Sequence, residues 1–172
     1  LRKGAMSTVY EALAQLKTLL LTATASGQPA LAAGYVYPNE YAAMPAVFSP
    51  PSIVVSELVN HLNSWERKAD GLAIHKWRAE IVLFAALGPL QSIGTDSAAA
   101  ELKTVNWAQA FAGVLWANQS LNGKAQIIGE QAGETRRLFE YMVGHVHWDT
   151  SVYWGMRIEL PVRQLHYQTM RA

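Results

Sequence analysis

Two runs of aromatic and β-branched residues near the C-terminal end constrain the fold most. They cover residues 138–148 and 152–162, and Asp149-Thr150-Ser151 lies between them. Such runs around a few turn-forming residues are typical of a β-hairpin. In the second run every other residue is apolar, and the residues between include Arg157 and Glu159. This alternation predicts a strand with one face in the core, and Pro161, which lacks an N–H, predicts that the strand ends there or lies at a sheet edge.

Other periodic segments predict the rest of the fold. A helix is expected over residues 8–23, where Thr8 and Glu11 form a capping box, and a second one runs from Asp96 or Ser97 to about residue 118. The apolar face of the second helix is so broad that we expect it to be covered on two sides. Strands are expected over residues 31–37, 52–59, 72–87 and 124–129, with a Pro-rich irregular crossing over residues 41–51. Residues 130–137 are expected only to lead into the C-terminal hairpin.

The expected order is one helix, three strands, a second helix and three more strands. Segregated helices with mostly hairpin-linked strands favour an α+β fold, in which two main helices pack on one face of a mixed, mostly antiparallel sheet. The continuous apolar centre of residues 52–59 places that strand inside the sheet. The fold class is therefore α+β.

The strand over residues 72–87 is unusually long, since strands typically have about five or six residues. On one of its faces Lys76, Arg78 and Glu80 give way to Val82 and Phe84. The side chains in the first half of this face should be exposed to solvent or form ion pairs. Those in the second half should be covered by other parts of the protein. We therefore expect the strand to project from the domain as a β-hairpin arm, with the charged loop of residues 61–71 at its tip. Such an arm is easier to hold in place when another subunit contacts it.

The chain of 172 residues is long enough for one domain with a sizeable core, which we assign to residues 7–172. Residues 1–6 are interpreted as a remnant of cloning or an N-terminal extension. A loose likeness of the N-terminal region to a signal peptide is interrupted by Glu11, Gln15 and Lys17, so no signal peptide is expected. No apolar run approaches the ~18 residues that a membrane span needs.

Composition favours assembly over catalysis. Charged residues make up 16% of the chain, apolar residues make up 51%, and there are six tryptophans. A surface so poor in charge is expected to be partly buried against other chains. The formal net charge of +1 is too small for strong attraction to nucleic-acid phosphates, so sequence-specific nucleic-acid binding is not expected. The absence of cysteine excludes disulfides, thiol nucleophiles and thiolate metal ligands.

One pattern could carry metal chemistry. His145, His147 and Asp149 have the spacing seen in binuclear metallohydrolases, and on a strand they would share one face. Thr150 stands where that family's motif continues with further ligands. The alternative interpretation is a pair of solvent or interface histidines. No phosphate-binding glycine loop and no serine-nucleophile context is present, so no cofactor and no catalytic residue are predicted.

The layout of the chain resembles a known family. The features that carry the likeness are an amphipathic N-terminal helix, Tyr35-Val36-Tyr37-Pro38 at a strand end, a Pro-rich crossing, a long strand over residues 74–87, a helix containing Trp107, and the hairpin of residues 141–162. Together they resemble the tail terminator, or tail completion, proteins of long-tailed bacteriophages. The likeness covers nearly the whole chain and depends on layout, not on a diagnostic motif.

The resemblance implies a structural virion protein with no active site. Members of that family form a hexameric ring that caps the tail tube, stops its polymerisation and joins the tail to the head connector. The implied partners are further copies of this chain, the tail tube protein and a head–tail connector or head-completion protein, and genomic DNA would pass through the ring. The implied location is the head-proximal end of the virion tail, with assembly in the host cytoplasm. The alternatives are another neck or head-closure component, or a small metal-dependent hydrolase using His145, His147 and Asp149.

Five residues are interface candidates. Trp65 in the expected arm tip is the candidate anchor, because buried tryptophan contributes strongly at protein interfaces. Arg67 and Lys68 beside it, and Arg157 and Glu159 on the polar face of the C-terminal strand, are candidates for secondary interface or lumen residues. The competing interpretation for all five is ordinary exposed surface.

Overall fold

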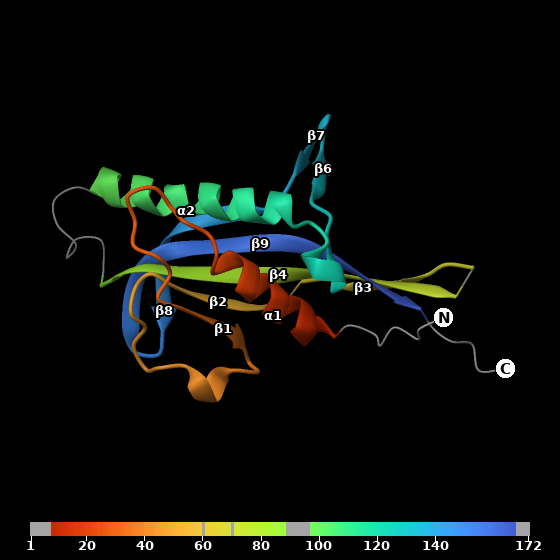
Figure 1. Cartoon of the computed structure of the whole chain (residues 1–172), viewed down its shortest axis with the longest axis horizontal. Coiled ribbons are helices and arrows are strands. Elements are labelled where there is room, and N and C mark those ends of the chain that lie inside the picture. The colour runs from red at the N-terminus through yellow and green to blue at the C-terminus, as the bar shows by residue number, and fades with distance from the viewer. Residues whose placement is uncertain (1–7, 60, 70, 89–96, 168–172) are drawn as a thin grey trace.

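The computed structural model describes residues 8–59, 61–69, 71–88 and 97–167. It has two helices lying on one face of a twisted sheet, as Figure 1 shows. The predicted α+β class, with two main helices on one face of a mostly antiparallel sheet, is confirmed. The interpretation of residues 1–6 and the side-chain cap at Asp96 or Ser97 concern parts outside this description.

The elements follow one another in the order that Figure 1 labels. The helices are α1 (Val9–Leu20) and α2 (Ser97–Ala117), with short 3₁₀ turns at Tyr41–Ala43 and Leu121–Gly123. The strands are β1 (Ala33–Tyr37), β2 (Ser52–Glu57), β3 (Ser64–Arg67), β4 (Leu72–Leu87), β5 (Gln126–Ile127), β6 (Glu130–Ala132), β7 (Thr135–Arg137), β8 (Glu140–Trp148) and β9 (Ser151–Tyr167).

The two long strands β4 and β9 form the centre of the main sheet, whose order is β1-β2-β4-β9-β5. They pair antiparallel from Leu72 opposite Tyr167 to Leu87 opposite Tyr153, with a register shift between Phe84 and Ala86. β3 joins β4 beyond the end of β2, and β8 joins β9 beyond the end of β5. Among the described strands of this sheet, the β1–β2 pair is parallel and the other pairs are antiparallel.

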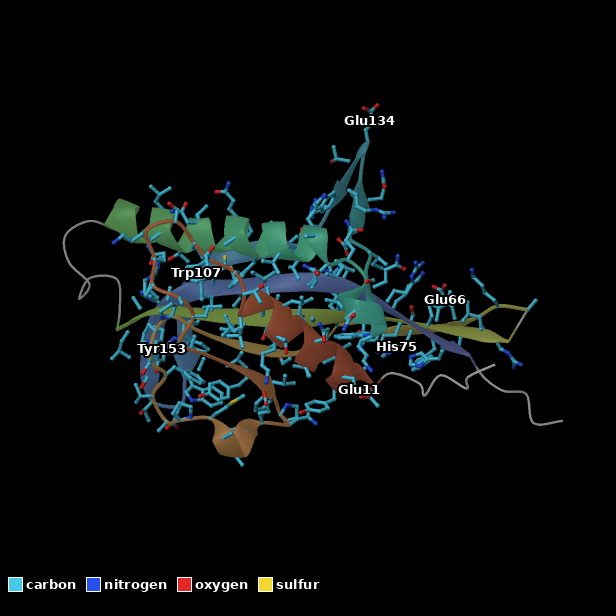
Figure 2. All side chains as sticks on the ribbon, in the orientation of Figure 1. Glu11, Glu66, His75, Trp107, Glu134 and Tyr153 are labelled. Atoms are coloured by element: carbon cyan, nitrogen blue, oxygen red, sulfur yellow. The ribbon has the colours of Figure 1, made fainter. Side chains whose placement is uncertain are left out.

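The main core lies between the helices and the sheet. α2 buries Trp107, Phe111 and Leu115 against it, and Figure 2 shows Trp107 between α2 and the sheet. The predicted apolar face of the C-terminal strand is confirmed from residue 156 onward. Its buried members are Met156, Ile158, Leu160 and Val162.

Helix α1 begins with the predicted capping box. The Glu11 N–H donates to the Thr8 hydroxyl at 3.1 Å, and the Glu11 carboxylate accepts from the Thr8 N–H at 2.7 Å. The helix ends at Leu20, three residues before the predicted end. The prediction that the second helix is covered on two sides is wrong for the single chain, because Leu102 and Trp116 on α2 are 63% and 58% exposed.

The prediction that Pro161 ends a strand or marks an edge is wrong. Pro161 lies inside β9, opposite Arg78 of β4. The Arg78 carbonyl accepts from Leu58 on the other side of β4, and the Pro161 carbonyl accepts from Ile128, so this pair shares no ladder bond. The nitrogen of Pro161 therefore points to the place where the neighbour of β9 changes from β8 to β5. A missing N–H costs no ladder bond there.

The arm is present but is built differently from the prediction. β4 has the predicted bounds, and Figure 1 shows its first residues, with β3, extending past the first turn of α1. The expected loop of residues 61–71 contains a strand, β3, paired antiparallel with residues 73–76 of β4. The far end of β9 pairs with the other side of β4. Three strands therefore form the arm.

Residues 130–137 also differ from the expectation. They form a hairpin of their own, β6 and β7, which stands away from the main sheet with Glu134 at its tip, as Figure 2 shows. The C-terminal hairpin itself is confirmed, although its turn has two residues, Asp149 and Thr150, and not three. Neither described helix combines the length and the apolarity that a membrane span requires.

Candidate interaction surfaces

The face of the sheet that the helices leave open carries two in-register rows of side chains. One row runs across five strands as Tyr35, Val54, Val82, Arg157 and Met142. The neighbouring row runs as Tyr37, Ser56, Glu80, Glu159 and Glu140. We call this the helix-free face. It brings the predicted residues Arg157 and Glu159 together.

Three carboxylates therefore stand side by side on β4, β9 and β8. Like charges directly opposite one another destabilise a sheet, so counter-charges are needed. Arg157 contacts Glu80 diagonally at 3.4 Å, and Arg78 contacts Glu159 diagonally at 3.3 Å. Arg78 also pairs with Glu130 of β6, and Arg137 of β7 pairs with Glu140. The arginines thus hold the glutamate row in place and tie the β6–β7 hairpin to the sheet.

One end of the helix-free face is covered by a second, aromatic core. Phe48 from the Pro-rich crossing packs against Phe84 with ring centroids 4.6 Å apart, and against Trp148 with centroids 5.1 Å apart. Tyr153 is fully buried in the same cluster. This confirms the prediction that the second half of the long strand is covered, since Val82 and Phe84 are buried here.

Polar contacts fix the crossing segment against the sheet. The Phe48 N–H donates to the Tyr153 hydroxyl at 2.7 Å, and the Trp148 indole N–H donates to the Pro45 carbonyl at 2.9 Å. At the other end the Glu40 carboxylate accepts from the Lys17 ammonium at 2.8 Å and from the Val36 N–H at 2.6 Å. Burial alone would raise the pKa of Glu40, but these hydrogen bonds and the charge of Lys17 lower it below its ordinary value.

Two open grooves result. The first, of about 610 Å³, lies between the crossing segment, the sheet and the turn of the C-terminal hairpin, and Tyr41, Trp148 and Arg157 are among its lining residues. The second, of about 490 Å³, follows the start of β8 and includes Tyr141 and Met142. Arg157 and Glu80 line both grooves, so their ion pair separates two parts of one surface. Aromatic walls with a few charges suit a protein segment.

The arm carries a separate cluster on the helix side of the sheet. The Trp65 ring stacks on His75 with centroids 4.3 Å apart and planes 2° apart, and His166 lies 5.1 Å from Trp65. The Trp77 ring lies 6.4 Å from that of His75, and its indole N–H donates to Gln164 at 3.0 Å. His166 is 6% exposed, and its two ring nitrogens are buried without a hydrogen-bond partner in the described part of the chain. Burial lowers the pKa of His75.

The predicted interface residues thus divide between two places. Arg157 and Glu159 lie on the helix-free face, whereas Trp65 alternates with Glu66 and faces the helix side of the arm. Arg67 shares the side of Trp65 by strand alternation and is exposed, as is Lys68 after the end of β3. Trp65 is 60% exposed despite its stacking. The structure does not bring Trp65 near Arg157 within one chain.

The candidate metal ligands do not gather. Among residues 8–59, 61–69, 71–88 and 97–167, no group of three or more His, Asp or Glu side chains is arranged to hold a metal ion. His145 instead meets the Trp154 ring edge-on at 5.7 Å. His147 and Asp149 line the wall of the first groove. The three residues share a region of β8 and its turn without forming a common site.

Several lining residues were missed from the sequence. Tyr41, Glu80, Tyr141 and Met142 contribute to the grooves, yet none was among the predicted site residues. The alternation of Met142 with Tyr141 and Val143 could have indicated a strand with two apolar faces, which is unusual at an exposed edge.

No protein-family model matches the chain, and no curated protein matches it.

Proposed function

We propose that this chain is a structural virion protein, the subunit of a ring that caps a phage tail tube, ends its polymerisation and joins the tail to the head connector. The observation that carries the proposal is apolar surface at two separate places. Trp65 on the arm is 60% exposed and Met142 on β8 is 70% exposed. Exposed aromatic and methionine side chains are typical of interface cores. Two different interaction surfaces on one subunit favour head-to-tail contacts between copies. Such contacts form a closed ring when the rotation from one subunit to the next divides a full turn evenly.

The grooved helix-free face supports contact with further partners. Its two grooves combine aromatic walls with the Arg157–Glu80 ion pair, a mixture that suits a protein segment and gives orientation to the contact. The proposed partners are the tail tube protein on one side of the ring and a connector or head-completion protein on the other. The proposed location is the head-proximal end of the tail, reached from the host cytoplasm. The proposal includes no catalytic residue and no cofactor.

Mass measurement in solution tests the assembly. The expected result is a species several times the 18.9 kDa of one chain, which negative-stain images resolve as a ring with a central opening. Metal analysis of the same sample addresses the alternative that uses His145, His147 and Asp149. A monomer that contains stoichiometric zinc would contradict the proposal and favour the hydrolase.

A second experiment separates a tail terminator from another neck component. Purified chain is added to the tail tube protein while it polymerises, and tube lengths are measured by electron microscopy. A terminator shortens the tubes in proportion to the amount added and is found at one end of each tube. A head-closure component would form an oligomer and leave tube length unchanged.

A further inference from the structure

The outer edge of strand β8 has no strand beside it in the described part of the chain. Its nine residues pair with β9 in a continuous register without a bulge, and no described strand pairs with its other side. Proteins usually block such an edge with lysine, proline or a bulge, because it offers unpaired N–H and C=O groups to another chain. β8 contains neither lysine nor proline, and Tyr141 and Met142 on it are 46% and 70% exposed. This edge is suited to receive a further strand.

The two-residue turn of the C-terminal hairpin determines which backbone N–H and C=O groups of β8 point away from β9. A two-residue turn joins the strands, so the flanking pair Trp148 and Ser151 exchanges ladder hydrogen bonds, and bonded pairs alternate from there. The backbone groups of Met142 and Glu140 therefore form hydrogen bonds with β9, whereas the backbone groups of Tyr141 and Val143 point away from it. An incoming strand would bond to Tyr141 and Val143.

At the opposite edge of the same sheet the described outer strands are β1 and β3. The edge of β1 is occupied at Val36, whose N–H donates to the Glu40 carboxylate and whose carbonyl accepts from the Glu40 N–H. Among the described residues β3 has no such cover: its four residues are all exposed, and β4 is the strand that pairs with it. The Lys68 N–H donates to the Leu72 carbonyl, so by alternation Trp65 and Arg67 point their backbone groups outward.

We propose that β3 of one copy adds to the outer edge of β8 of the next copy, so that the sheet continues from subunit to subunit. The inference rests on the proposed function and names the contact that would build the ring. β3 is antiparallel to β4, β4 to β9 and β9 to β8, so β3 runs antiparallel to β8. Two copies placed side by side in the same orientation therefore meet in antiparallel pairing, with their helices on the same side.

One register matches both backbone and side chains. Placing Trp65 opposite Val143 and Arg67 opposite Tyr141 aligns the outward groups of the two strands. The same register places Trp65 against an apolar side chain and the Arg67 guanidinium beside an aromatic ring, both of which are favourable cross-strand pairs. It also brings Lys68 opposite Glu140. Arg67 and Lys68 form no ion pair within the described part of the chain. Glu140 pairs with Arg137 of its own chain and stands opposite Glu159, so a further cation beside Glu140 would be favourable.

Disulfide trapping tests the contact, because the chain has no cysteine of its own. In this register Glu66 faces Met142 in a pair without ladder bonds, where the Cα atoms lie about 4.5 Å apart, within the range of a disulfide. Glu66→Cys and Met142→Cys chains are prepared separately, mixed and oxidised. The expected product is a mixed dimer on a non-reducing gel. Gln109→Cys, on the exposed side of α2, replaces Met142→Cys in the matched control and should yield no mixed dimer.

Each other outcome has a definite meaning. A disulfide dimer of Met142→Cys chains alone, without the mixed dimer, would show β8 paired with β8 and overturn the inference. A ring-sized species that gives no mixed dimer would overturn this contact and leave the proposed function standing. A monomer would overturn both.

A second variant tests the edge without cysteine. Tyr141→Pro removes an outward N–H and no bond of the β8–β9 ladder, so the chain should fold and the oligomer should dissociate. A folded Tyr141→Pro chain of unchanged oligomeric mass would overturn the inference.

Discussion

The indole ring of Trp65 lies flat against the imidazole ring of His75, with centroids 4.3 Å apart and planes 2° apart. Trp65 belongs to an exposed edge strand, whereas His75 is buried in the strand that runs on into the core. The stack therefore joins the arm's outermost strand to the body of the protein. It also places a titratable ring directly beneath the candidate interface residue.

Acidification is expected to destabilise the arm through His75. Burial lowers the pKa of His75 below its ordinary value, the charge of Glu57 and a hydrogen bond with Gln164 oppose this, and His166 adds to the lowering. A histidine with a lowered folded pKa favours its neutral form, so its contribution is complete above a pH of about 6.5 and is lost as the pH falls below that value. The urea midpoint should drop between about pH 7.5 and pH 5.5.

The control for this prediction is His75→Phe, which keeps a flat ring beneath Trp65 and cannot be protonated. Its urea midpoint should depend less on pH than that of the parent chain. If the urea midpoint depends equally on pH in both chains, the pH dependence arises from titratable groups other than His75.

Replacing Gly155 with alanine should destabilise the fold strongly. A Cβ at Gly155 would lie 1.9 Å from the Leu83 carbonyl oxygen and 2.8 Å from the Val146 side chain, so the central strands would have to separate. We expect a loss of roughly 2–4 kcal/mol in the free energy of unfolding. Gly144, directly opposite on β8, has no atom within 4 Å of such a Cβ. Gly144→Ala should therefore be neutral or stabilising by up to about 1 kcal/mol in the same urea titration.

Tyr153→Phe tests the anchor of the crossing segment. The substitution removes the hydroxyl that accepts from the Phe48 N–H at 2.7 Å and leaves that N–H buried without a partner. The expected loss is about 1–3 kcal/mol in the free energy of unfolding. Tyr141→Phe, at an exposed position, should change it by less than about 0.5 kcal/mol. Equal effects of the two substitutions would show that the hydroxyl of Tyr153 is dispensable.

Arg78→Gln tests the counter-charge of the glutamate row. Arg78 pairs with both Glu130 and Glu159, and its side chain is 17% exposed. Removing its charge leaves neighbouring carboxylates opposed across the strands, which should cost about 1–2 kcal/mol at low salt and less at high salt, which screens the repulsion. Lys76→Gln breaks the more exposed pair with Glu66 and should cost under about 0.5 kcal/mol. A cost for Arg78→Gln that does not change with salt concentration would argue against charge repulsion as its cause.

Local signals were sufficient for much of the secondary structure. The capping box starts α1, the period-two pattern of residues 72–87 coincides with β4, and the apolar runs around Asp149-Thr150 form the C-terminal hairpin. Each of these depends on residues close together in the chain. The change from Lys76, Arg78 and Glu80 to Val82 and Phe84 likewise indicated where the second face of β4 is covered.

The α+β class, the long central strand and a surface short of charge all follow from the amino-acid sequence. In contrast, the three-dimensional arrangement was needed to show that Pro161 lies inside the sheet, that residues 64–67 form a strand, and that Trp65 and Arg157 occupy opposite faces. The physical reason is that pairing register and the neighbour across each strand arise from residues far apart in the chain. β9 tolerates Pro161 because its nitrogen points to the place where the neighbouring strand changes from β8 to β5. The three glutamates align because β4, β9 and β8 pair in this register. The sequence of one strand alone does not contain this information.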